Sequence, residues 1–143
     1  MGAATTYKKA YGAAEVETLS QRDILVKLFQ GAERFLVQAQ LAIHNRQVEM
    51  AHTNCQKARA IFVELLSTLN FEQGGEIAIQ LRDLYVFLIG QITEANLRKD
   101  AAKLSALLPT IATLREAWEQ IPDEHARTSS LRTGDGSTFS TTT

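Results

Sequence analysis

The sequence predicts an all-α fold, an antiparallel up-and-down four-helix bundle, on three observations. Four segments of about 20 residues carry apolar residues at helical spacing, polar or glycine-containing turns separate them, and no segment alternates with period two for long enough to form a sheet. Helices joined by short turns pack antiparallel to their sequence neighbours. We expect the bundle over residues 20–122, with an N-terminal arm over residues 1–19 and a disordered tail over residues 123–143.

The first helix is expected to begin at Ser20. Ser20 and Asp23 have the spacing of a capping box, in which the serine oxygen accepts a hydrogen bond from a free amide and the acid complements the positive helix end. The apolar residues then follow helical spacing: Ile24, Leu25, Leu28, Phe29, Ala32, Phe35, Leu36, Ala39 and Ile43. The polar stretch 44–47 predicts a turn after this helix.

The second helix shows the alternating steps of three and four residues that are typical of a bundle seam. The seam consists of Val48, Ala51, Cys55, Ala58, Phe62, Leu65 and Leu69. Gly74 and Gly75 can adopt backbone φ values that other residues rarely adopt, and such residues often end a helix. We therefore expect the second helix to end within residues 70–75 and a third helix to run over about residues 76–97.

The third segment is apolar on two faces. One stripe is expected to face the core: Ile77, Leu81, Leu84, Tyr85, Leu88, Ile92 and Ala95. The opposite side is also apolar, with Ile79, Val86 and Leu97 around Gly90, and Phe87 at the flank. A single bundle covers only one side of such a helix, so the arm, a second copy or a foreign chain is expected to cover the other. The alternative is that these are isolated surface residues, which are common on any protein.

The fourth helix is expected to begin after Asp100, a plausible N-cap, and to end at Pro122. Its seam consists of Leu104, Leu107, Ile111, Leu114, Trp118 and Ile121. Pro109 lies inside this seam and predicts a kink or a break, because it removes one amide donor and clashes with the preceding turn at about 3 kcal/mol. The segment after Pro122 is rich in Ser, Thr and Gly, which predicts a disordered tail.

Composition excludes several classes of function. The 143 residues carry a formal net charge of −1 with acids and bases mixed, so we do not expect nucleic-acid binding. No stretch approaches the roughly 18 uncharged apolar residues that are needed to span a bilayer, so we do not expect membrane insertion. Cys55 is the single cysteine, and we expect a cytoplasmic protein without an intramolecular disulfide.

No set of residues predicts catalysis, a metal site or a cofactor. Glu49 and His52 share one helix face, but a di-iron bundle needs this motif twice. The surroundings of His52 resemble a phosphotransfer histidine faintly, with Cys55 and Gln56 where that class has Lys and Gly. A solvent-facing histidine is the preferred interpretation.

An ordered series of short motifs along residues 7–121 resembles the FliS family of flagellar export chaperones. The motifs are the pair Tyr7 and Tyr11, then Val16-Glu17-Thr18, Leu28-Phe29-Gln30-Gly31, Leu69-Asn70, Gly74-Gly75-Glu76-Ile77-Ala78, Leu81, Leu84-Tyr85, Glu94-Ala95-Asn96-Leu97, Lys99-Asp100 and Ala117-Trp118. Residues 19–23, Pro109 and the Thr-rich tail depart from the family pattern.

The resemblance implies a cytoplasmic bacterial chaperone, not an enzyme, without a cofactor. Such a protein binds the disordered C-terminal segment of flagellin, prevents premature polymerisation and presents it to the flagellar type III export apparatus. This function fits the second apolar face of the third helix, where we expect flagellin to bind. The candidate residues are Ile79, Tyr85, Val86, Phe87, Gly90 and Leu97. It also implies that the arm, with Tyr7, Tyr11 and Val16, lies over part of this surface when no client is bound. We expect a monomer or weak homodimer, and the alternatives are a self-associating regulatory bundle or a His52 phosphotransfer module.

Overall fold

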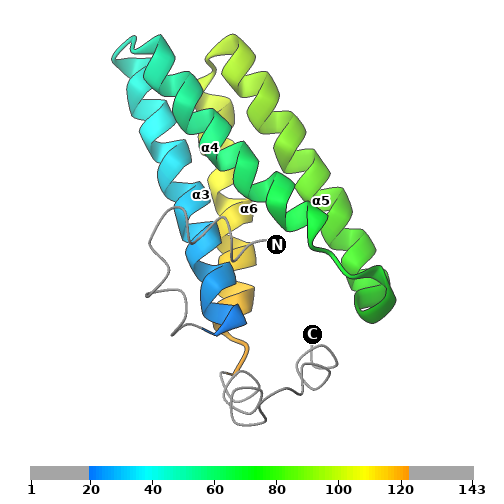
Figure 1. The fold of residues 1–143 in the computed structure, drawn as a ribbon. Helices are drawn as coiled ribbons and strands as arrows, with labels where there is room; N and C mark the ends of the chain where they lie inside the picture. Colours follow the sequence, from blue (N-terminus) through cyan, green and yellow to red (C-terminus); the bar gives the residue numbers. More distant parts are fainter. Residues whose placement is uncertain (1–19, 123–143) are drawn as a thin grey trace.

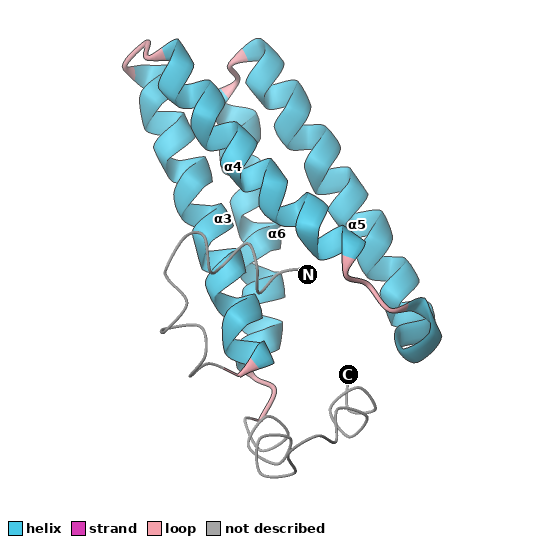
Figure 2. Ribbon diagram, in the orientation of Figure 1, coloured by secondary structure: helices cyan, strands magenta, loops and turns pink. Residues whose placement is uncertain are grey.

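The computed structural model describes residues 20–122, and these residues form four helices joined by short turns (Figure 1). The helices are α3 (Gln21–His44), α4 (Val48–Ser67), α5 (Phe71–Arg98) and α6 (Ala101–Glu119). Figure 2 shows that no strand accompanies them within the described range. The predicted all-α bundle is confirmed. The predicted arm and tail lie outside the described residues.

The four helices form a closed ring of neighbours. α3 packs against α4 and α6, and α5 packs against α4 and α6, with the α5–α6 pair making the least contact. Figure 1 shows the reason, because the N-terminal end of α5 diverges from α3 and α6. Because α5 packs against α4 and α6, the side of α5 that faces away from the core has no neighbouring helix among residues 20–122.

Three aromatic side chains join three of the helices at the centre of the core. Phe62 of α4 lies 6.4 Å from Phe29 of α3 and 6.1 Å from Tyr85 of α5, measured between ring centroids. All three side chains are buried. Tilted ring pairs at this distance stabilise a core beyond their area burial.

Side-chain caps fix the starts of three helices. Ser20, Asn70 and Asp100 each accept a hydrogen bond from the backbone amide three residues later, at 3.0 Å in every case. These caps satisfy amides that have no partner within the helix. The predicted caps at Ser20 and Asp100 are confirmed, whereas the cap at Asn70 was not predicted.

The predicted end of the second helix was wrong, whereas the predicted break at the glycine pair is present, because the non-helical backbone of Gly75 separates a short first turn from the rest of α5. α4 ends at Ser67, before the glycines, and α5 begins at Phe71 because Asn70 caps it. Gly75 makes a kink within α5, with φ 51° and ψ −124°, a backbone conformation that side chains with a Cβ rarely adopt. The first turn of α5 is therefore not collinear with the rest of the helix.

Three residues predicted to face the core are exposed. They are Val48, Ile77 and Ile121. Val48 is the first residue of α4 and Ile121 follows the end of α6, so each lies where the bundle ends. Ile77 lies near the start of α5, and Figure 1 shows that this end of α5 diverges from α3 and α6.

The predicted break at Pro109 does not occur, because α6 continues through this residue. Pro109 and Ser105, the residue one turn earlier whose carbonyl loses an amide donor, are both exposed. Water can therefore hydrate the freed carbonyl, which lowers the cost. The Thr113 hydroxyl also donates to the Pro109 carbonyl at 2.9 Å.

Replacing Gly75 with Ala is expected to lower the free energy of unfolding by about 1–3 kcal/mol, because Ala must adopt a strained backbone conformation. An added Cβ at Gly75 meets no atom within 4 Å, so backbone strain is the only cost. Gly90→Ala is the matched control, since Gly90 is helical with open space around it. It should raise the free energy of unfolding by up to about 1 kcal/mol. Urea denaturation measures both, and equal shifts would contradict the kink.

Candidate functional site

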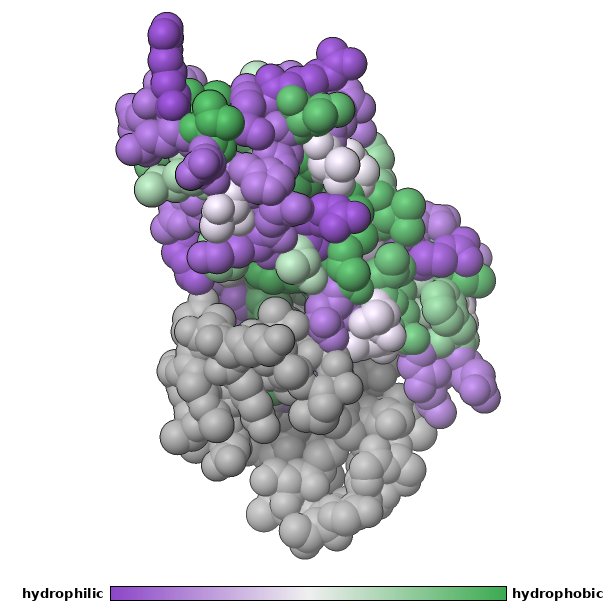
Figure 3. Space-filling model, turned by 45° about the horizontal axis from the view of Figure 1, so that its top comes forward, coloured by the Kyte–Doolittle hydropathy of each residue, from purple (hydrophilic) through white to green (hydrophobic). Residues whose placement is uncertain are grey.

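The unpartnered side of α5 carries a row of exposed apolar residues. We call Ile79, Val86, Phe87, Gly90 and Leu97 the α5 apolar face. The exposed fractions are 43% for Ile79, 53% for Val86, 51% for Phe87 and 83% for Leu97, and Gly90 is also exposed. Figure 3 shows hydrophobic residues gathered on the side of the molecule where α5 lies.

Spacing explains why these residues share one side. Ile79, Val86, Gly90 and Leu97 are separated by seven, four and seven residues, which are nearly whole turns of an α-helix. The stripe that faces the core lies on the other side of α5 and includes Leu88, Ile92 and Ala95, all buried. The helix thus has two apolar sides, as its sequence predicts.

Tyr85 lies in the core and not on the α5 apolar face. It is 2% exposed and its ring contacts Phe62, in agreement with its place in the predicted core stripe. Burial raises the pKa of Tyr85 to about 12, because it disfavours the charged phenolate. Tyr85 therefore holds α5 against α4 and takes no part in the α5 apolar face.

A shallow groove between α5 and α6 extends the α5 apolar face at Phe87. Its α6 wall includes Ala102, Lys103, Ala106 and Leu107. Ala102 and Ala106 are four residues apart and leave space between the helices. The Lys103 ammonium donates to Gln91 Oε1 at 3.3 Å and pairs with Glu94 at 3.4 Å, which borders the groove with polar groups. This groove was not predicted from the sequence, in which the spacing of the two alanines is the signal for it.

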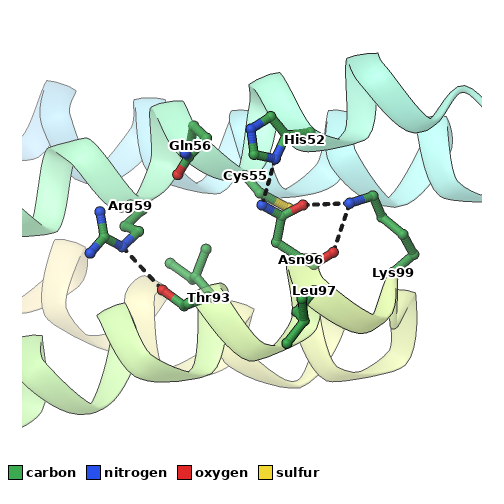
Figure 4. A pocket seen from close by; sticks show the side chains of 9 residues that line it. His52, Cys55, Gln56, Arg59, Thr93, Asn96, Leu97 and Lys99 are labelled. Carbon is green, nitrogen blue, oxygen red and sulfur yellow. Dashed lines mark hydrogen bonds between the residues drawn. The ribbon is translucent and has the colours of Figure 1, made fainter.

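A pocket between α4 and α5 lies at the other edge of the α5 apolar face, and we call it the α4/α5 pocket (Figure 4). Its lining is polar with a few apolar side chains: His52, Cys55, Gln56, Arg59, Ile92, Thr93, Asn96, Leu97 and Lys99. Leu97 belongs to both the pocket and the α5 apolar face, so the two are continuous.

Asn96 is the centre of a hydrogen-bond network at one end of this pocket. The Lys99 ammonium donates to Asn96 Oδ1 at 2.8 Å and to the Asn96 carbonyl at 2.7 Å. An ammonium can only donate, so the amide oxygen faces Lys99 and the amide nitrogen faces His52 Nδ1, 2.9 Å away. His52 Nδ1 is therefore the acceptor of this bond. Sequence reasoning could not find this network, because His52 and Asn96 belong to different helices.

The histidine and cysteine have no arrangement that indicates chemistry. His52 is exposed and uses Nδ1 to accept from Asn96, and within residues 20–122 no three His, Cys, Asp or Glu side chains are grouped to hold a metal ion. Cys55 is buried, and burial raises the pKa of its thiol although the nearby Lys99 ammonium opposes this shift. A raised pKa leaves little reactive thiolate.

Among residues 20–122, no helix is both long enough and apolar enough to cross a bilayer. The candidate arm residues Tyr7, Tyr11 and Val16 lie outside the described residues.

Comparison with known proteins gives a consistent result. The family model described as flagellar protein FliS matches residues 3–125. Three flagellar secretion chaperones named FliS are similar to the chain. The Vibrio cholerae protein is 32% identical over 93% of this chain and 98% of its own length. The Salmonella typhimurium protein is 35% identical over 79% and 87%, and the Campylobacter jejuni protein is 31% identical over 78% and 88%.

Proposed function

The chain belongs to the FliS family of flagellar secretion chaperones, and from this we propose that its client is the C-terminal segment of flagellin, bound on the α5 apolar face. In this function the protein is not an enzyme and needs no cofactor. It holds the segment in the cytoplasm, prevents premature polymerisation and presents flagellin to the flagellar type III export apparatus.

The observation that carries this proposal is the exposure of the α5 apolar face. Single exposed apolar residues are common, but here Ile79, Val86 and Leu97 repeat on one side of one helix while Phe87 opens into the adjoining groove. Exposed apolar residues that gather on one side of a helix favour a binding site for another chain. An amphipathic segment that folds on binding lays its apolar side into such a surface.

The arm is proposed to cover part of the α5 apolar face when the client is absent. Tyr7 and Tyr11 suit this exchange, because an aromatic ring with a polar tip can pack on an apolar surface and also be released to water. Val16 would add a further apolar contact. This part of the proposal depends on the family resemblance.

Binding is expected to give a complex of one chain and one flagellin segment. The purified chain is mixed with a peptide of the flagellin C-terminal segment, and the mass in solution is measured with and without the peptide. Calorimetry at several temperatures should show a large negative heat-capacity change, because binding buries apolar surface and orders the segment. Absence of a complex, or a heat-capacity change near zero, would contradict the proposal.

Self-association is the second candidate, because a second copy could also cover the α5 apolar face. The same mass measurement tests it without peptide. A stable dimer that excludes the flagellin segment would favour a self-associating bundle, whereas a monomer or a weak dimer that the peptide dissociates favours the chaperone.

A further inference from the structure

We propose that the α4/α5 pocket is a carboxylate-binding site for the client, in which Arg59 binds an acidic side chain while Leu97 contacts an apolar side chain one turn away on the same client helix. This inference deepens the proposed function and rests on it. It adds a charged anchor to a surface that is otherwise apolar.

The first argument is the charge of the pocket. Arg59 and Lys99 line it, and no Asp or Glu does. Elsewhere in the bundle some arginines have a carboxylate partner, as Arg115 has Glu33 at 2.8 Å. Within residues 20–122, Arg59 has no such partner. The pocket lining thus brings two positive side chains together without a carboxylate among its residues.

The second argument is that Arg59 is held ready to bind. Its Nε donates to Thr93 Oγ1 at 3.0 Å, and the Thr93 hydroxyl donates in turn to the Ile89 carbonyl at 2.8 Å. Figure 4 shows Arg59 reaching from α4 towards Thr93 on α5. This chain of bonds fixes the guanidinium, while Nη1 and Nη2 have no hydrogen-bond partner among the described residues. Two parallel N–H groups of this kind match the two oxygens of a carboxylate.

The third argument is the position of the pocket beside the α5 apolar face. Leu97 follows Thr93 by four residues, or about 6 Å along α5 at 1.5 Å per residue. A client helix lying along α5 would therefore meet Arg59 and Leu97 with side chains three or four residues apart. The occupant that fits is an amphipathic helix with Asp or Glu one turn from an apolar residue. The ion pair would fix the register of the client, which apolar contacts alone specify weakly.

Arg59→Gln and Arg98→Gln form a matched pair that tests this site. Both remove one positive charge, but the Arg98 side chain is 70% exposed, pairs with Glu94 at 3.8 Å and does not line the pocket. Calorimetry with the flagellin C-terminal peptide should show affinity about ten-fold weaker for Arg59→Gln, because a charge-assisted bidentate contact is lost. Arg98→Gln should change affinity by less than about two-fold. If both variants lose the same affinity for the peptide, the loss comes from the change in net charge and not from the pocket. That result would overturn the inference.

Two further measurements separate this inference from the proposed function and from folding. Thr93→Val keeps the Arg59 charge but removes the acceptor for Nε, so it should weaken binding, and Thr93→Ser should restore it. Neutralising the paired acid in the peptide should cost as much as Arg59→Gln, with no added loss when both are combined. If the unaltered chain does not bind the peptide, both proposals fail. If it binds and both Arg59→Gln and Thr93→Val bind as tightly, only the carboxylate site fails.

Discussion

Replacing Phe62 with Ala is expected to lower the free energy of unfolding by about 3–5 kcal/mol. Phe62 is 0% exposed and its ring contacts Phe29 and Tyr85, so its removal leaves a cavity where three helices meet. The neighbouring side chains cannot easily move into this cavity, because the rings of Phe29 and Tyr85 belong to α3 and α5. Urea denaturation followed by the helical signal measures the loss.

Val63→Ala is the matched control for this prediction. Val63 follows Phe62 on α4 but is exposed, so its truncation should cost less than about 1 kcal/mol. The two variants together test whether the aromatic cluster stabilises the bundle. A loss below about 1 kcal/mol for Phe62→Ala as well would contradict that role.

The parts of the fold that the sequence predicted are those with local signals. The cap at Ser20 and the seam of α3 lie within one helix, and the spacing of their residues is enough to place them. The cap at Asp100 likewise marks the start of α6. The two apolar sides of α5 were predicted for the same reason. Successive residues of an α-helix are rotated by 100° about its axis, so Tyr85 faces the core while the next residue, Val86, faces water.

The parts that the sequence did not predict depend on tertiary structure or on competition between signals. Gly75 separates two helical pieces as predicted, but the short turn before it was not predicted, because it depends on the cap that the Asn70 side chain provides. Pro109 remains within α6 because the carbonyl that loses its donor lies on an exposed side. Ile77 has core spacing but is exposed, because it lies near the start of α5, the end that diverges from α3 and α6.

The α4/α5 pocket shows the same limit for the candidate site. Arg59 and Thr93 are 34 residues apart in sequence and belong to different helices. From the sequence of its own helix alone, each is predicted to be an ordinary polar residue that faces solvent. Only the packing of α4 against α5 brings the guanidinium to the threonine hydroxyl. An apolar face can therefore be predicted from one helix, but a polar anchor between two helices cannot.

Replacing Val86 with Glu is expected to leave the bundle folded and to weaken binding of the flagellin C-terminal peptide by about 2 kcal/mol or more, roughly thirty-fold. Val86 is more than half exposed, so water solvates the new carboxylate in the free chain. In the complex the apolar client would bury this charge without a partner. Calorimetry measures the affinity, and the helical signal reports the fold.

Two further substitutions to Glu define what this result means. Leu88→Glu, two residues away on α5, places the charge where the side chain is 0% exposed and should unfold the protein. Val37→Glu on α3 changes a residue that is 44% exposed, with the same change in charge, on a helix that makes no part of the α5 apolar face. It should leave both fold and affinity unchanged. If Val86→Glu and Val37→Glu bind the peptide equally well, the second apolar side of α5 is an ordinary exposed surface and the client must bind elsewhere.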